Sequence, residues 1–324
     1  MLTLDQICFS PFADAWVWLK PRGLDRVLNS VSPPAVTDWE KFVASCLQER
    51  TKIEQENVKS SKPEVEVRKD FFHYLFNAVD PETGKGYDLN ELYGECELLI
   101  VAGSDTTSIV MSAMVFYLVR NPEIQRKLAK EISSTFSGYN QIVGGPQLHS
   151  CRYLKAFIQE ACRMAPPVGA EPARSVLSGG TIVENQYFPE GIKLSTSCYC
   201  LSYNPDVYPD PFAFKPERWL LADAENPHGA TQESLALAES GFCAFSAGSR
   251  GCVGKNLAWL EMMIIIAKMV YRFEVKQDPT SNLGGGRIDG PEGRQQEGQY
   301  QTYDAFVALR DGPTVRFEKR DVAV

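Results

Sequence analysis

The stretch FSAGSRGCVG, residues 245–254, decides the fold, because its residue types and spacing carry the most specific signal in the chain. It leads directly into a segment of helical periodicity that starts at Lys255, so Cys252 is predicted to lie at a helix N-terminus. The helix dipole and the free N–H groups there favour a thiolate, and Arg250 adds positive charge nearby. Glycines allow the backbone to turn back beneath a flat ligand. The stretch therefore predicts a loop that presents a cysteine thiolate to such a ligand.

Two other interpretations of this stretch fit less well. A phosphate-binding loop is suggested by Gly248, Gly254 and Lys255, but five residues separate the two glycines and Asn256 stands where Ser or Thr binds magnesium. A buried structural cysteine explains neither the glycines nor Arg250.

Composition excludes several classes of protein. The 324 residues include 33 Lys and Arg against 41 Asp and Glu, so the formal net charge is −8 and no electrostatic field gathers nucleic acid. Nine cysteines, an odd number without a CxxC pair, indicate a reducing compartment, and three separated histidines argue against a zinc site. No Lys or Arg precedes Lys20, so no secretory signal is predicted. No uninterrupted apolar run approaches ~20 residues, so no transmembrane anchor is predicted.

Working outward from the cysteine stretch, periodicity predicts a mainly α chain with a small β portion. Asp88 and Glu91 form a capping-box pattern that opens a long, nearly all-apolar helix. The predicted helices cover residues 36–58, 65–79, 89–120, 122–136, 153–164 and 255–273. Short strands are predicted within 181–197, ordered coil over 204–219, and a hairpin of 302–309 with 314–318 around Asp311-Gly312.

Three further segments carry unusual residues. AGSDTTS, residues 102–108, interrupts the long apolar helix with poor helix formers and an acid, which indicates either a packing notch or a functional site. Glu160 and Arg163 stand three residues apart on a short predicted helix, a spacing also typical of a surface ion pair. FKPERW, residues 214–219, lies in the coil and allows Arg218 to reach both.

These four motifs, in this order and spacing, together resemble the cytochrome P450 family. The resemblance implies the C-terminal part of that fold, with a long central helix, a helix bearing the Glu-x-x-Arg pair, a meander and the cysteine loop. It implies that residues 1–84 are a remnant of the N-terminal helical part and that 85–324 form the haem-binding core, within a single domain overall. DPETG, residues 80–84, is most similar to members from filamentous fungi, which implies secondary metabolism or aromatic hydroxylation.

The resemblance also implies roles for individual residues. Cys252 is the axial ligand of the iron of haem b, shielded by Phe245, and no histidine is needed. Arg250 and Arg174 meet the haem propionates. Asp105 and Thr106 deliver protons to dioxygen. The remaining implied residues are Gly248 and Gly254 in the loop, Ala102 and Gly103 as the space over the iron, and a buried structural triad of Glu160, Arg163 and Arg218.

The implied activity is that of a haem-thiolate monooxygenase, which inserts one oxygen atom of O2 into a small apolar organic substrate. Its electrons come from NADPH through a reductase. The family implies an endoplasmic reticulum membrane location, whereas this chain alone reads as cytoplasmic and soluble, with membrane association only through an N-terminal anchor. Because no counterpart of the family's N-terminal helices is found, the alternative is a truncated, catalytically silent P450 fragment. A haem-free binding module is a third interpretation.

Overall fold

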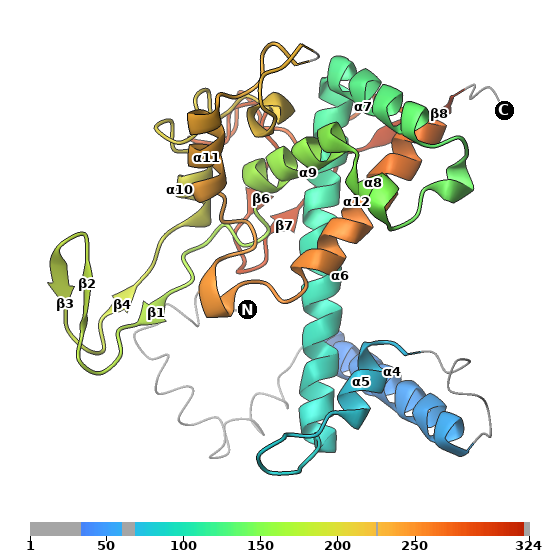
Figure 1. Ribbon diagram of the computed structural model, residues 1–324, viewed down its shortest axis with the longest axis vertical. Helices are drawn as coiled ribbons and strands as arrows, with labels where there is room; N and C mark the ends of the chain where they lie inside the picture. Colours follow the sequence, from blue (N-terminus) through green and yellow to red (C-terminus); the bar gives the residue numbers. More distant parts are fainter. Residues whose placement is uncertain (1–33, 60–68, 225, 321–324) are drawn as a thin grey trace. The chain divides into compact units, whose positions relative to one another are not determined.

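The computed structural model describes residues 34–59, 69–224 and 226–320 (Figure 1). The predictions for residues 1–33, including the absence of a secretory signal, and the first part of the helix predicted at 65–79 lie outside these residues. The chain divides into two compact units, one up to Ser104 and one from Asp105 onward. The division predicted between residues 84 and 85 therefore stays a prediction.

Within its described residues, 34–59 and 69–104, the first unit contains two helices and the first half of a third. Helix α4 (Pro34–Lys59) and helix α5 (Phe71–Asn77) cover most of the predicted helical segments. Helix α5 begins at Phe71 because the carboxylate of Asp70 accepts a hydrogen bond from the backbone N–H of His73 and so caps the helix. A small apolar core lies between α4 and the first turns of the helix that begins at Leu89. It comprises Val43, Leu47, Leu92 and Cys96.

Helix α6 (Leu89–Arg120) is one continuous helix over the predicted residues. Its capping box is present, since the N–H of Glu91 donates to Asp88 and the N–H of Asp88 donates to Glu91. By length and composition alone α6 could span a membrane, which a count of uninterrupted apolar residues does not reveal. Polar residues interrupt the apolar residues of α6, so the helix contains no long unbroken apolar run although its mean hydropathy is high. Its C-terminal half is buried in the second unit, as in core helices of soluble proteins.

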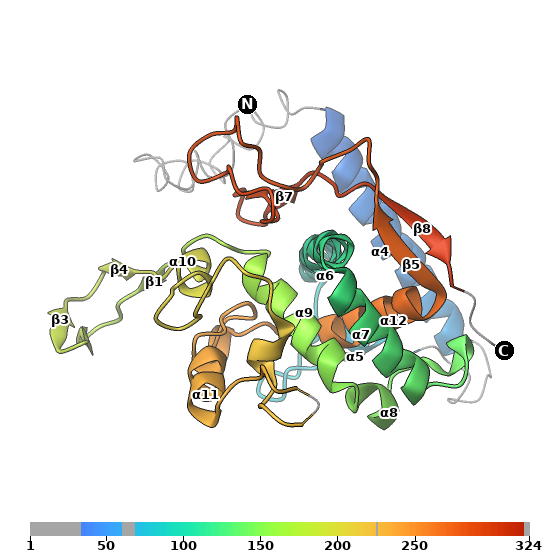
Figure 2. The ribbon, with the colours of Figure 1, turned by 90° about the horizontal axis from the view of Figure 1, so that it is seen from above.

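In the second unit three helices pack around the C-terminal half of α6, as Figure 2 shows from above. They are α7 (Pro122–Thr135), α9 (Arg152–Met164) and α12 (Lys255–Arg272), with the short helices η3 (Tyr139–Gln141) and α8 (Pro146–His149) between α7 and α9. The largest core cluster joins these helices through residues such as Met114, Leu128, Phe157 and Ile266. This core holds α9, which carries Glu160 and Arg163, and α12, which directly follows the cysteine motif.

The β portion of the described residues consists of four two-stranded antiparallel sheets. The pairs are β1 (Arg174–Ser175) with β4 (Lys193–Leu194), β2 (Thr181–Val183) with β3 (Gln186–Phe188), β5 (Phe273–Gln277) with β8 (Val315–Lys319), and β6 (Thr302–Tyr303) with β7 (Leu309–Arg310). Between them lie α10 (Cys198–Ser202), η4 (Pro216–Trp219), α11 (Gln232–Ser240) and η5 (Gly248–Arg250). The mainly α class with a small β portion is confirmed.

The hairpin predicted around Asp311-Gly312 was wrong. Strand β8 pairs with β5, which directly follows α12, and places Phe317 opposite Val275. The rings of Phe317 and Phe273 also meet edge to face at 5.6 Å between centroids. Pro313 follows the turn and has no N–H, so the predicted hairpin lacks one hydrogen-bond donor next to its turn. Residues 315–319 therefore pair with the apolar strand β5 instead.

Candidate functional site

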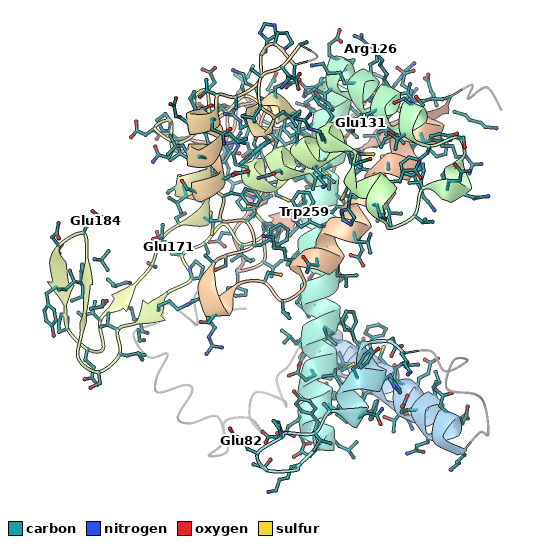
Figure 3. The ribbon with its side chains drawn as sticks, viewed as in Figure 1. Glu82, Arg126, Glu131, Glu171, Glu184 and Trp259 are labelled. Atoms are coloured by element: carbon teal, nitrogen blue, oxygen red, sulfur yellow. The ribbon has the colours of Figure 1, made fainter. Side chains whose placement is uncertain are left out.

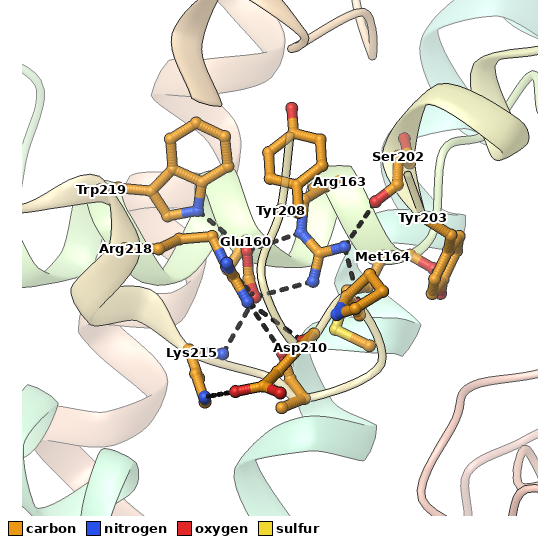
Figure 4. A network of polar contacts seen from close by, with 12 residues as sticks. Glu160, Arg163, Met164, Ser202, Tyr203, Tyr208, Asp210, Lys215, Arg218 and Trp219 are labelled. Carbon is orange, nitrogen blue, oxygen red and sulfur yellow. Dashed lines mark hydrogen bonds and ion pairs between the residues drawn. The ribbon is translucent and has the colours of Figure 1, made fainter. Parts of the chain in front are cut away.

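The carboxylate of Glu160, on helix α9, is fully buried at the centre of a polar network (Figure 4). Its Oε1 accepts hydrogen bonds from Arg163 Nη2 at 2.8 Å, Arg218 Nε at 3.0 Å and the backbone N–H of Lys215 at 2.9 Å. Its Oε2 accepts from Arg163 Nε and from Trp219 Nε1, both at 2.9 Å. Both oxygens are therefore satisfied by donors from α9 itself and from η4 with the residue before it.

The two arginines also bind the end of α10 and the coil between α10 and η4, residues 203–215, which we call the meander. Arg163 Nη1 donates to the carbonyl oxygens of Ser202 at 2.6 Å and Pro211 at 2.9 Å. Arg218 donates to three carbonyl oxygens of the same coil, those of Pro209, Asp210 and Ala213. A proline-rich coil leaves carbonyl groups without ladder partners, and a guanidinium offers several donors in one plane. The triad thus holds an otherwise irregular segment in one conformation.

The charge state of Glu160 follows from these partners. Burial by itself raises the pKa of the carboxyl, because it removes water from the charged form. The charges and N–H groups of Arg163 and Arg218, with the N–H of Lys215, outweigh burial and hold the pKa below its usual range. Glu160 is therefore ionised at neutral pH, and its hydrogen bonds are of the stronger, charge-assisted kind.

The cysteine loop, residues 245–254, connects α11 to α12 and is closed by its own backbone. The N–H of Cys252 donates to the carbonyl of Phe245 at 2.9 Å, and the N–H of Gly251 donates to that of Gly248 at 3.0 Å. Gly248 has φ +69°, in the left-handed region that favours glycine. The side chain of Cys252 is exposed, and Gly254 precedes the first turn of α12, which no side chain caps.

The residues around Cys252 fit a flat group that takes a thiolate ligand and carries acidic edges. A Cβ built on Gly248 meets nothing within 4 Å, and one on Gly254 meets only the Cys252 sulfur, at 3.8 Å. Val253 is a fully exposed apolar side chain. Arg250 is exposed, and within the described part of the chain its side chain makes no hydrogen bond or ion pair. An accessible cysteine sulfur with an exposed arginine nearby is a donor set that fits a haem-thiolate site.

A chain of aromatic rings connects the Glu160 network to the cysteine loop. The indole of Trp219, which donates to Glu160, meets the ring of Phe242 at 5.5 Å between centroids. Phe242 contacts Phe245 at 6.3 Å, and Phe245 stacks on Trp259 of α12, labelled in Figure 3, at 6.3 Å. The loop therefore packs through Phe242 against Trp219 of η4 on one side and against α12 on the other.

The other predicted site residues lie outside the Glu160 network and the cysteine loop, on helix α6 and strand β1. Ala102 and Gly103 belong to the part of α6 in the first unit, whereas Asp105 and Thr106 belong to the part in the second. A Cβ on Gly103 meets nothing within 4 Å, and Asp105 is exposed. Arg174 on β1 is exposed and donates to the adjacent carbonyl of Ala173 at 3.0 Å. The roles of these five residues stay predictions.

Comparison with known proteins decides the family. The family model described as cytochrome P450 matches residues 16–284, more than half of the chain. This chain belongs to the cytochrome P450 family. The predicted family is thereby confirmed.

Relatives in filamentous fungi agree with this P450 membership. The chain is 34% identical over 298 residues to cytochrome P450 monooxygenase AKT7 of Alternaria alternata, covering 91% of this chain and 55% of the relative. It is 38% identical over 280 residues to cytochrome P450 monooxygenase fscF of Fusarium equiseti, covering 86% and 51%. A solved crystal structure of a cytochrome P450 shares the fold with a TM-score of 0.64 at 23% identity, covering 86% of this chain and 56% of the other. The chain spans about half the length of the curated relatives it matches.

Some residues of this P450 site received no role from the sequence. Trp219 stands in the PERW motif, and its indole is a fifth donor to Glu160. Tyr208 is buried, with its ring 5.0 Å from the guanidinium carbon of Arg163. Glu131 of α7, labelled in Figure 3, accepts hydrogen bonds at 2.8 Å from the N–H groups of Tyr153 and Leu154 at the start of α9. Only Trp219 had a sequence signal, its place beside Arg218.

We expect Glu160→Gln to lower the free energy of unfolding by about 3–5 kcal/mol, because it leaves the fully buried guanidinium of Arg163 and the largely buried one of Arg218 facing an uncharged amide. Urea denaturation of the two proteins measures the difference. Glu292→Gln, at an exposed position, is the matched control and should change the free energy by less than about 0.5 kcal/mol. Equal effects of the two substitutions would contradict the role of Glu160.

The depressed pKa of Glu160 also predicts how this difference depends on pH. A carboxyl with a lower pKa in the folded than in the unfolded state stabilises the fold above its ordinary pKa, and the contribution is lost as the pH falls through the folded-state value. The stability gap between the parent and Glu160→Gln should therefore be constant near neutral pH and shrink in acid. Urea titrations across the acid range measure the gap, and a gap that widens in acid would reverse the sign of the argument.

Proposed function

We propose that this chain carries the cysteine-ligand side of a haem-thiolate monooxygenase that inserts one oxygen atom of O2 into a small apolar organic substrate. The observation that carries the proposal is the exposed Cys252 in its backbone-closed, glycine-containing loop at the start of α12. The proposed division is a remnant of the N-terminal helical part over residues 1–84 and a haem-binding core over 85–324. Bound haem b supplies the activation of dioxygen.

The proposed roles around the cofactor follow the chemistry of each side chain. Cys252 holds the iron through its thiolate, and Phe245 shields that sulfur from water. Gly248 and Gly254 keep the loop free of side chains where a flat ring approaches, consistent with the open space at Gly248 and with a Cβ on Gly254 meeting only the Cys252 sulfur. The guanidinium groups of Arg250 and Arg174 bind acidic edges. The Glu160 network fixes the meander and, through Trp219 and Phe242, the ring of Phe245.

On helix α6, Ala102 and Gly103 are proposed to leave space for small reactants. The carboxylate of Asp105 and the hydroxyl Oγ1 of Thr106 are proposed to hold and pass protons. Electrons are proposed to arrive from NADPH through a reductase. The fungal relatives and the DPETG segment at 80–84 favour secondary metabolism or aromatic hydroxylation, at the endoplasmic reticulum membrane.

The chain spans about half the length of the curated relatives it matches, and this motivates one alternative, a catalytically silent chain that keeps the motifs but does not retain haem. The two proposals differ in the haem content of the purified, folded chain. About one haem per chain supports the monooxygenase, and a folded chain that binds none after incubation with haemin supports the silent product.

We expect the chain loaded with haem, reduced and treated with carbon monoxide, to show the red-shifted Soret band of thiolate ligation. Cys252→Ser should lose this band. Cys200→Ser, an exposed cysteine on α10, is the matched control and should keep it. A parent chain that binds haem without the band, or a Cys252→Ser variant that keeps it, would contradict ligation by Cys252.

We expect Thr106→Ala to leave haem binding unchanged and to uncouple electron use from product formation, because the hydroxyl that passes protons is gone. With a reductase and any compound found to be turned over, the measurement is product and hydrogen peroxide formed per NADPH consumed. Ser112→Ala, six residues further along α6, is the control and should couple normally. Unchanged coupling in Thr106→Ala would remove Thr106 from the relay.

A further inference from the structure

Two cysteines outside the cysteine loop contact each other. Cys198 is the first residue of α10, and Cys243 lies two residues before Phe245. The sulfur of Cys198 is 3.9 Å from the carbonyl oxygen of Cys243, and the sulfur of Cys243 is 3.7 Å from the carbonyl oxygen of Cys198. These reciprocal contacts place the thiols beside each other, and both side chains are half-buried and reduced.

We propose that Cys198 and Cys243 form a redox-active dithiol that closes to a disulfide when the protein meets hydrogen peroxide. The Cys198 thiolate attacks one peroxide oxygen, the O–O bond breaks, and a sulfenic acid and hydroxide result. The sulfur of Cys243 then attacks the Cys198 sulfur, its proton leaves with the departing hydroxide, and the S–S bond forms. In sum, two thiols are oxidised by two electrons, one peroxide is reduced, and two waters are released.

The two thiols are not chemically equivalent, which sets the order of these steps. The hydrogen bond from Cys243 favours the thiolate of Cys198 and lowers its pKa to about 7, although burial acts in the opposite direction. The same contact raises the pKa of Cys243. Cys198 is therefore the nucleophile that meets peroxide, and Cys243 is the resolving thiol.

The position of the pair gives the disulfide a structural consequence. The carbonyl of Cys243 accepts the N–H of Ser246 at 2.8 Å, within the cysteine loop. The side chain of Ser202 bonds to Cys243, while its carbonyl accepts Arg163 of the triad at 2.6 Å. A bond between Cys198 and Cys243 would tie α10 to the start of the cysteine loop. In a reducing compartment, disulfides of this kind are typically transient and redox-sensing.

The test uses the full chain of 324 residues, reduced and then treated with hydrogen peroxide, followed by peptide mass mapping without reduction. We expect a linked pair of peptides containing Cys198 and Cys243, lighter by two hydrogen atoms than the separate peptides. In Cys243→Ser, Cys198 should accumulate as a sulfenic acid that dimedone traps. In Cys198→Ser, Cys243 should be oxidised more slowly than Cys198 is in the parent, because burial by itself still raises the pKa of the Cys243 thiol.

Cys200→Ser is the matched control, because Cys200 is exposed on the same short helix, and it should form the same link as the parent. Circular dichroism confirms that each variant is folded before oxidation. The proposal is overturned if folded parent protein keeps Cys198 and Cys243 as free thiols while Cys200 or Cys252 is oxidised. It is also overturned if the link forms only in urea. These readouts do not depend on haem or on turnover.

Discussion

Five N–H donors converge on the buried carboxylate of Glu160, and the conformation of the meander depends on their doing so together. A buried charge is expensive to desolvate, so the arrangement is stable only when every donor is in place. Replacing the whole network with apolar groups could preserve stability, but removing one member leaves the others buried and uncompensated. The network is therefore stable only when all five donors and the carboxylate are present together. It accounts for why α9, η4 and a proline-rich coil adopt one arrangement.

That constraint extends to the candidate cofactor site through packing. Trp219 is both a donor to Glu160 and a ring partner of Phe242, which in turn contacts Phe245 at the start of the cysteine loop. The loop is also held from α12, by Trp259 stacked on Phe245. The proposed thiolate ligand needs a fixed backbone, and the cysteine loop is held on one side from η4, far away in sequence, and on the other from α12, which directly follows it. The Cys198 and Cys243 pair touches the same junction and offers a way to regulate it.

Several features were predictable because their signals are local. The bounds of α6 follow from the capping box of Asp88 and Glu91 and from Asn121-Pro122 at its end. The approach of Arg218 to Glu160 followed from the order of the motifs. Other features were not predictable, because they join distant segments without a pattern. The pairing of β8 with β5, the capping of α9 by Glu131, and the contact of two cysteines 45 residues apart are examples. The packed core determines which distant segments meet in these contacts. A buried tyrosine such as Tyr208 has no sequence signal that distinguishes it from any other core residue.

The central claim is that Cys252 binds the iron of haem through its sulfur. X-ray absorption at the iron K-edge of the haem-loaded ferric chain tests it most directly, because the spectrum distinguishes sulfur from nitrogen and oxygen among the iron's nearest neighbours. The account predicts one sulfur neighbour in the parent and none in Cys252→Ser. A parent spectrum that requires only nitrogen and oxygen neighbours would contradict it.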